Sequence, residues 1–174
     1  SWWMNSSQRR RLGAVAVTAF AIGYTALLPS FLIGIRHGQF SERSWAGTAL
    51  LFFPLVVTWV CDSAAMFGGR AFGGPKLAPT ISPGKTRSGG LSGVVGGVLI
   101  APLFVLVIFP RVGVELALLP ACLIALALSV VGQLGDLAES LFKREAGVKD
   151  SSTLIPGHGG VLDRFDSLYV VLPT

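Results

Sequence analysis

Charged side chains are scarce in this sequence: they make up 13% of the 174 residues, against about 25% in an ordinary soluble domain. Hydrophobic residues make up 52%, and the mean hydropathy is +0.68. So few charges cannot cover the surface of a soluble domain of this length, and so many apolar residues exclude a disordered chain. The composition therefore indicates an integral membrane protein with one domain of a few helices.

Cysteine and histidine are also rare. Cys61 and Cys122 lie in separate apolar runs, so they form neither a disulfide framework nor a Cys-x-x-Cys pair. With His37 and His158 as the 2 histidines, a zinc site of histidine and cysteine ligands is not expected. The net charge of +5 is compatible with nucleic-acid binding. However, the basic residues cluster at the ends of apolar segments, where membrane topology explains them, so we expect no nucleic-acid partner.

Four uncharged runs are long enough to cross a bilayer, because about 20 helical residues span the hydrocarbon core. These runs are Leu12–Ile35, Ser44–Cys61, Ser88–Pro110 and Leu116–Gly135. Pro29 and Pro54 predict kinks in the first two runs. Small residues at Gly93, Gly96 and Gly97 favour close helix packing in the third.

These runs predict an all-α, polytopic membrane bundle. We expect one catalytic domain over residues 1–174, with a further helix starting at Ser167. The chain opens on Ser-Trp-Trp and stops inside a fresh apolar run, which leads us to expect a fragment of a longer protein. The first apolar run is too long for a signal peptide and lacks a small-residue cleavage site.

Basic residues fall unevenly on the two sides of the predicted spans. If the N-terminus is cytoplasmic, 11 of the 14 lysines and arginines lie on the cytoplasmic side and the remaining 3 lie opposite. This asymmetry follows the positive-inside rule. Two polar segments, 62–87 and 136–166, then share the cytoplasmic face and hold most reactive side chains. We therefore predict a multi-pass protein of the cell inner membrane whose site faces the cytoplasm.

The segment that begins at Asp136 continues the fourth span as a helix. Asp136, Ser140 and Lys143 are spaced i, i+4 and i+7, so they share one face. Glu139 and Arg144 flank that face. An acid directly after an uncharged run of 20 residues is costly unless it is paired or binds a cation. The alternative is a solvated helix end with ordinary i,i+4 pairs.

Further along, a glycine-rich turn surrounds His158 and lets the backbone approach an anion closely. The alternative is a surface turn with an incidental histidine. Asp163 and Asp166 lie one turn apart if a helix begins there. Together with Asp136 they would form an oxygen-rich site for Mg²⁺. The alternative is that both acids complement a helix dipole.

The first polar segment carries basic residues on a Gly/Pro-rich stretch, 68–84, that we expect to be a loop. The basic residues, accompanied by Asp62, are Arg70, Lys76, Lys85 and Arg87. This set suits a polyphosphate, and the alternative is that it only determines topology. Gly84-Lys85-Thr86 is similar to the end of a Walker A loop. That pattern needs glycine at position 79, where this chain has Pro79, and no strand is expected before the loop. A P-loop NTPase is therefore excluded.

The stretch Ser140–Asp166 resembles the signature of phosphatidate cytidylyltransferases, also called CDP-diacylglycerol synthases. On this chain the signature runs S-x-x-K-R-x(4)-K-D-x(5)-P-G-H-G-G-x-x-D-R-x-D. Upstream, D-S-A-A-x-x-x-G-R from Asp62 and K-L-x-P-x-I-S-P-x-K-T from Lys76 are similar to the same family. Arg87 and Ser88 depart from the family pattern, which has an aromatic residue and an acid there, so that acid's role does not carry over.

The resemblance implies transfer of a cytidylyl group from CTP to phosphatidic acid, and three groups of site residues. Catalytic roles fall to Asp136, Ser140, Lys143, Arg144, His158, Asp163 and Arg164. Substrate binding falls to Asp62, Arg70, Lys76, Ser82, Lys85, Thr86, Lys149, Asp150, Gly159 and Gly160. Metal binding falls to Asp136 and Asp163, joined by Asp166 and Glu139.

The expected cofactor is Mg²⁺, alone or with a second metal or a monovalent ion. The expected partners are CTP, phosphatidic acid, the bilayer and, as one option, a second copy of the chain.

Other functions stay open at this point. A CTP-dependent polyprenol or phytol kinase, or a synthase of a CDP-activated ether lipid, would use a similar acid-rich membrane face. A cation transporter would need Asp136 and Asp163 near the bilayer midplane in repeated halves, whereas here they lie at one surface and no repeat is visible. A structural membrane anchor gives no reason to gather acids, bases and glycines in this order.

Overall fold

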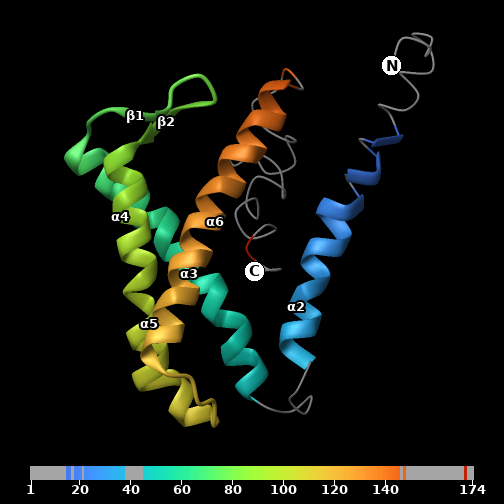
Figure 1. Cartoon of the computed structure of the whole chain (residues 1–174), viewed down its shortest axis with the longest axis vertical. Helices are drawn as coiled ribbons and strands as arrows, with labels where there is room; N and C mark the ends of the chain where they lie inside the picture. Colours follow the sequence, from blue (N-terminus) through green and yellow to red (C-terminus); the bar gives the residue numbers. More distant parts are fainter. Residues whose placement is uncertain are drawn as a thin grey trace, which may run out of the picture.

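The structure is a computed structural model that describes residues 15–16, 18–20, 22–37, 45–145, 147 and 171 (Figure 1). Its elements in chain order are η1 Gly23–Leu27, α2 Leu28–His37, α3 Trp45–Phe72, β1 Lys76–Ala78, β2 Ser82–Thr86, α4 Arg87–Val98, α5 Ile100–Leu103, η2 Phe104–Ile108, η3 Phe109–Val112 and α6 Leu118–Glu145. Eight of the predicted site residues lie outside the described part: Lys149, Asp150, His158, Gly159, Gly160, Asp163, Arg164 and Asp166.

Within the described residues, three helical stretches are long and apolar enough to cross a membrane: Trp45–Phe72, Arg87–Val112 and Leu118–Glu145. They coincide with the second, third and fourth predicted runs to within two residues at their starts, and the protein is an all-α, polytopic membrane protein. The first predicted run falls partly outside the described residues. Its described part turns from π-helix to α-helix at Leu28, directly before Pro29, which is where proline disturbs helical hydrogen bonding.

The three long helical stretches form one bundle around a small apolar core. Figure 1 shows α4 and α6 running alongside α3, with α2 on the opposite side of α3 from α4. Phe53, Phe104 and Phe109 meet edge to face, with ring centroids 5.1, 5.5 and 5.7 Å apart, the geometry that aromatic quadrupoles favour. Val57 and Val171 are buried in the same core.

Glycines bring α3 and α4 into backbone contact. A Cβ added to Gly93 would lie 2.9 Å from the Cys61 carbonyl oxygen and 3.0 Å from the Ala65 Cβ, and one added to Gly96 would lie 2.6 Å from the Ala64 Cβ. Contacts this short leave no room for a side chain, so glycine is what permits the approach. The predicted close packing of this helix is thus confirmed.

The expected loop over 68–84 is wrong in two respects. Helix α3 continues past Cys61 to Phe72, so Gly68 is helical, and an antiparallel hairpin of β1 and β2 follows. Gly73 and Gly74 take the left-handed φ values of 58° and 99° that turn the chain between helix and hairpin. The physical reason is that Gly73 and Gly74 turn the chain, whereas Gly68 and Gly69 lie in α3, where an added Cβ would meet the Ser92 and Thr86 side chains. The expectation of no strand near Gly84-Lys85-Thr86 is wrong as well, because these residues lie on β2.

Candidate active site

A cavity of about 550 Å³ opens at the end of the bundle where α3 ends and α4 begins. Its polar wall combines three cationic residues with two carboxylates and one amide: Arg70, Lys76, Lys85, Asp62, Asp136 and Gln133. The rest of the wall is mainly glycine and small apolar side chains. Sites for small molecules span roughly 300–1,000 Å³, so the cavity is of a size and charge that suit a polar, anionic ligand.

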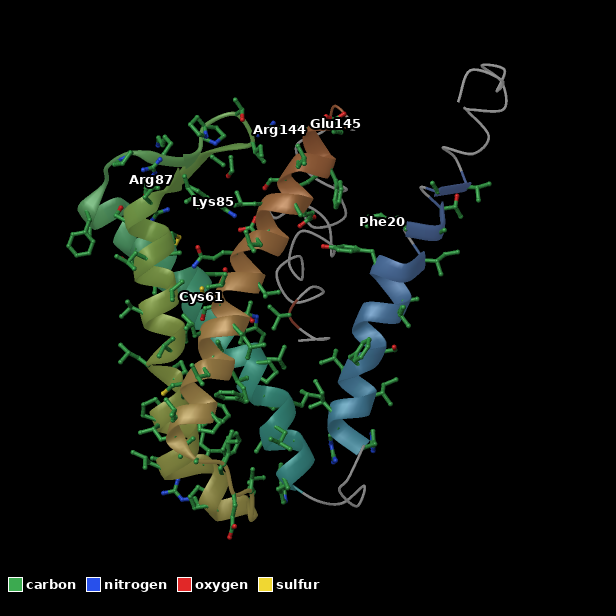
Figure 2. The ribbon with its side chains drawn as sticks, viewed as in Figure 1. Phe20, Cys61, Lys85, Arg87, Arg144 and Glu145 are labelled. Carbon is green, nitrogen blue, oxygen red and sulfur yellow. The ribbon has the colours of Figure 1, made fainter. Side chains whose placement is uncertain are left out.

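The centre of the cavity is an ion pair between Lys85 on β2 and Asp136 on α6. The Lys85 Nζ contacts the Asp136 Oδ2, and the two side chains are 27% and 29% exposed. Figure 2 shows Lys85 extending from the base of the hairpin toward α6. The pair explains how an acid directly after an apolar span is tolerated, because an opposite charge compensates it. It also joins two chain segments that lie far apart in the sequence.

The local backbone holds Lys85 in place. Thr86 caps α4, and its hydroxyl oxygen accepts a hydrogen bond of 3.1 Å from the Gly89 N–H. The Ser88 hydroxyl donates to the carbonyl oxygen of Gly73, directly after the end of α3. Because β2 passes directly into α4, these bonds fix the direction in which Lys85 leaves the hairpin. Thr86 also lines the cavity, so this residue, predicted to bind substrate, has a structural role in the helix cap.

Of the predicted residues within the described part, six line the cavity: Asp62, Arg70, Lys76, Lys85, Thr86 and Asp136. Five do not belong to its wall: Ser82, Glu139, Ser140, Lys143 and Arg144. The alternative of an i,i+4 pair is realised by Glu139 and Lys143, whose charged atoms lie 3.6 Å apart. The Arg144 Nε donates to the Ile81 carbonyl oxygen at 3.5 Å, so the end of α6 contacts the tip of the hairpin.

Sequence reasoning missed Gln133. This residue lines the cavity one helical turn before Asp136, and its Nε2 donates to the Gly90 carbonyl oxygen at 2.9 Å. The signal that could have found it is an amide inside a run that is otherwise nearly free of polar side chains. A buried polar group in a membrane helix is costly unless it is bonded, so such a residue marks a specific contact.

The fold and the cavity together describe a polytopic membrane protein with a charged cavity at one end of its helical bundle. The family model described as "Cytidylyltransferase family" matches residues 2–174, and the chain belongs to that family. This agrees with the family that the resemblance in the sequence indicates.

Three relatives show how far the similarity extends. The chain is 40% identical over 153 residues to a phosphatidate cytidylyltransferase of Haemophilus influenzae, and the matched region covers 86% of this chain and 53% of the relative. It is 39% identical over 185 residues to that of Staphylococcus saprophyticus, with 98% and 69% covered. It is 47% identical over 161 residues to that of Brucella suis, with 90% and 53% covered. The chain thus spans between about half and two thirds of the length of these curated relatives.

Proposed function

We propose that the protein transfers a cytidylyl group from CTP to phosphatidic acid, which yields CDP-diacylglycerol and pyrophosphate. The observation that carries this proposal is the cavity in which Lys85 faces Asp136 at the end of a membrane bundle. Family membership and relatives that bear the name phosphatidate cytidylyltransferase support the same reaction. A site at the bilayer surface suits an enzyme whose acceptor is a lipid headgroup and whose donor is water-soluble.

In the proposed reaction, a phosphate oxygen of phosphatidic acid attacks the α-phosphorus of CTP. A new P–O bond forms, and the bond from the α-phosphorus to the oxygen shared with the β-phosphate breaks, so pyrophosphate leaves with the electron pair. The attacking oxygen is already anionic, so no activated serine or cysteine is required. The barrier is the meeting of two anions, and catalysis of such transfers rests mainly on positioning and charge stabilisation.

The cationic residues of the cavity supply this stabilisation. Lys85, on β2 directly before the capped start of α4, would exchange its contact with Asp136 for one with a phosphate oxygen. Arg70 and Lys76 lie on the same cavity wall and would bind the remaining triphosphate charge. Lys143 and Arg144 remain proposed contacts for the lipid phosphate, together with Arg164.

Magnesium is the proposed cofactor, and the donor chemistry of the cavity fits it. Within the described residues, no three His, Cys, Asp or Glu side chains gather at one point. Asp62 and Asp136 nevertheless offer carboxylate oxygens to one cavity, and such oxygens are the ligands that Mg²⁺ prefers. Asp136 with Asp163, joined by Asp166, would hold the ion, whereas Glu139 is buried outside the cavity wall and pairs with Lys143. When bound, it would supply positive charge that offsets the negative charge of the reacting phosphates.

We also propose that the cavity faces the cytoplasm across a cell inner membrane. Basic residues gather at the cavity end of the described bundle: Arg70, Lys76, Lys85, Arg87, Lys143 and Arg144. The opposite helix ends carry Arg36 and Arg111. This distribution is the one that the positive-inside rule associates with a cytoplasmic face.

The test is incorporation of cytidine label into lipid by the purified protein in mixed micelles. CTP with a labelled cytidine ring, phosphatidic acid and Mg²⁺ are supplied together, and phosphatidic acid is then omitted. We expect lipid-soluble label that needs phosphatidic acid. Lys85→Met should lose at least about tenfold in kcat/KM, because a charge-assisted hydrogen bond contributes roughly 1.5–3 kcal/mol. Arg111→Met, at the opposite end of the bundle, is the matched control and should stay active. Label that appears without phosphatidic acid would overturn the proposal.

A further inference from the structure

The amide of Gln133 lies directly beneath the charged centre of the cavity. Gln133 precedes Asp136 by three residues on α6, so the two side chains share one helix face. Both line the cavity, and Gln133 is half-buried. An amide at this depth in a membrane-spanning helix is favourable only when it is hydrogen-bonded.

The nitrogen of this amide joins three helices. Its Nε2 donates to the Gly90 carbonyl oxygen of α4 at 2.9 Å and to the Cys61 Sγ of α3 at 3.5 Å. The fit is tight on both sides. A Cβ added to Gly90 would lie 3.1 Å from the Gln133 Oε1, and one added to Gly93 would lie 3.0 Å from the Nε2. Two glycines of α4 therefore leave space for this side chain and little else.

The bond to Gly90 acts on the part of α4 that carries the site. Gly90 lies in the first turns of α4, and Thr86 caps that helix directly after Lys85. Since β2 runs into α4 without an intervening residue, any sliding of α4 along α6 also moves Lys85. The Gln133 bond fixes that register one helical turn away from Asp136.

We propose that Gln133 is a positioning residue, whose amide holds α4 against α6 in the register at which Lys85 faces Asp136. It acts through Lys85 and is not itself a catalytic residue. The proposal rests on the proposed cytidylyl transfer and adds a residue that the sequence signature does not include. A second hydrogen bond, the 3.5 Å contact of Arg144 with the Ile81 carbonyl oxygen, joins α6 to the tip of the hairpin. That contact lies eight residues after Asp136 along α6, whereas Gln133 lies three residues before it.

A double-mutant cycle tests this coupling. Gln133→Met keeps the length of the side chain and removes both hydrogen bonds. We expect it to lower kcat about tenfold or more, because misplacement of a catalytic group by an ångström is costly, and to change KM for CTP little. In a Lys85→Met background, Gln133→Met should change kcat by less than about twofold, because no lysine remains to be positioned. The same loss in both backgrounds would overturn the proposal.

Ser129→Ala is the matched control, because it also removes a polar group from the buried face of α6. The Ser129 hydroxyl donates to the Ala125 carbonyl oxygen at 2.7 Å, a bond within α6 and not between helices. This variant should keep kcat within about twofold of the parent, because the lost bond does not hold Lys85 in place and its cost of about 1 kcal/mol falls on stability. A loss equal to that of Gln133→Met would mean that any polar deletion on this face reduces activity, and would contradict a specific role for Gln133.

Alkylation of Cys61 separates positioning from loss of packing. The Cys61 side chain contacts Gln133 and is 2% exposed, so a maleimide should react with it slowly while the helices stay packed. In a Cys122→Ser background, Gln133→Met should keep this protection while kcat falls. Reaction as fast as in the unfolded protein would show a merely structural role and overturn the proposal. If the wild-type protein shows no cytidylyl transfer at all, the proposed function is contradicted. If the wild type is active but the effects of Gln133→Met and Lys85→Met on kcat simply add, only the positioning role of Gln133 is contradicted.

Discussion

The contact between Gly97 and Ser129 gives the sharpest test of the packing that supports the site. A Cβ added to Gly97 would overlap the Ser129 hydroxyl oxygen and lie 3.3 Å from the Ser129 Cβ. Ser129 is fully buried and its hydroxyl is held by Ala125, so the oxygen has no free space to move into. Overpacking of this kind costs about 1–3 kcal/mol. The higher helix propensity of alanine compared with glycine offsets up to about 1 kcal/mol of this cost.

Gly97→Ala should therefore destabilise the protein by up to about 2 kcal/mol. Ser129→Ala removes the overlapping oxygen and leaves the Cβ contact of 3.3 Å, which small shifts of the two helices relieve. In that background Gly97→Ala should be close to neutral or slightly stabilising. The expected coupling between the two substitutions is thus about 1–3 kcal/mol.

The assay is thermal unfolding of the four variants at one protein concentration in one detergent. A change of 1 kcal/mol corresponds to roughly 2–4 °C in Tm for a chain of this size. Gly97→Ala should lower Tm by several degrees alone and by about one degree or less with Ser129→Ala. Equal Tm shifts in both backgrounds would contradict the contact between Gly97 and Ser129, because they would show that α4 and α6 do not meet at these two residues.

Three further predictions follow from the site and its turns. Asp163→Asn should lose most activity while membrane insertion persists, and full activity in that variant would contradict its assignment as a metal ligand. EDTA should abolish cytidylyl transfer and added Mg²⁺ should restore it, since the proposed metal site is built from carboxylates. Activity that EDTA leaves unchanged would contradict the proposed metal dependence. Gly73→Ala should destabilise the protein by about 1–2 kcal/mol in thermal unfolding, because Gly73 has φ of 58°. Gly84→Ala, with open space around its Cβ position, should not, and equal effects would contradict the hairpin turn.

The membrane helices could be predicted because a long uncharged run is stable as a helix within the hydrocarbon core of a bilayer. Ser88–Pro110 lies within the observed helical stretch Arg87–Val112, and Leu116–Gly135 overlaps most of Leu118–Glu145. The end of α3 could not be predicted from hydropathy, since helix continues for another 11 residues beyond Cys61 through polar and small side chains. The hairpin was missed because its strands are short and carry turn-forming residues.

The candidate site was predictable in its residue types and less so in its contacts. The sequence indicated that Asp136 needs a partner, and spacing along one helix offered only Ser140 and Lys143. The observed partner is Lys85, which lies 51 residues earlier and reaches Asp136 only because the glycine contacts bring α4 beside α6. The role of Gln133 could not be predicted for the same reason, since it depends on Gly90 and Cys61 from two other helices.

In the proposed reaction, the protein moves the α-phosphate of CTP, with its nucleoside, onto phosphatidic acid. The most direct measurement follows CTP labelled at the α-phosphate and CTP labelled at the γ-phosphate in parallel reactions with phosphatidic acid and an added polyprenol. We expect α-label in a lipid that depends on phosphatidic acid, with an equal amount of γ-label released as pyrophosphate. Transfer of the γ-label to the polyprenol would contradict it and identify a lipid kinase instead.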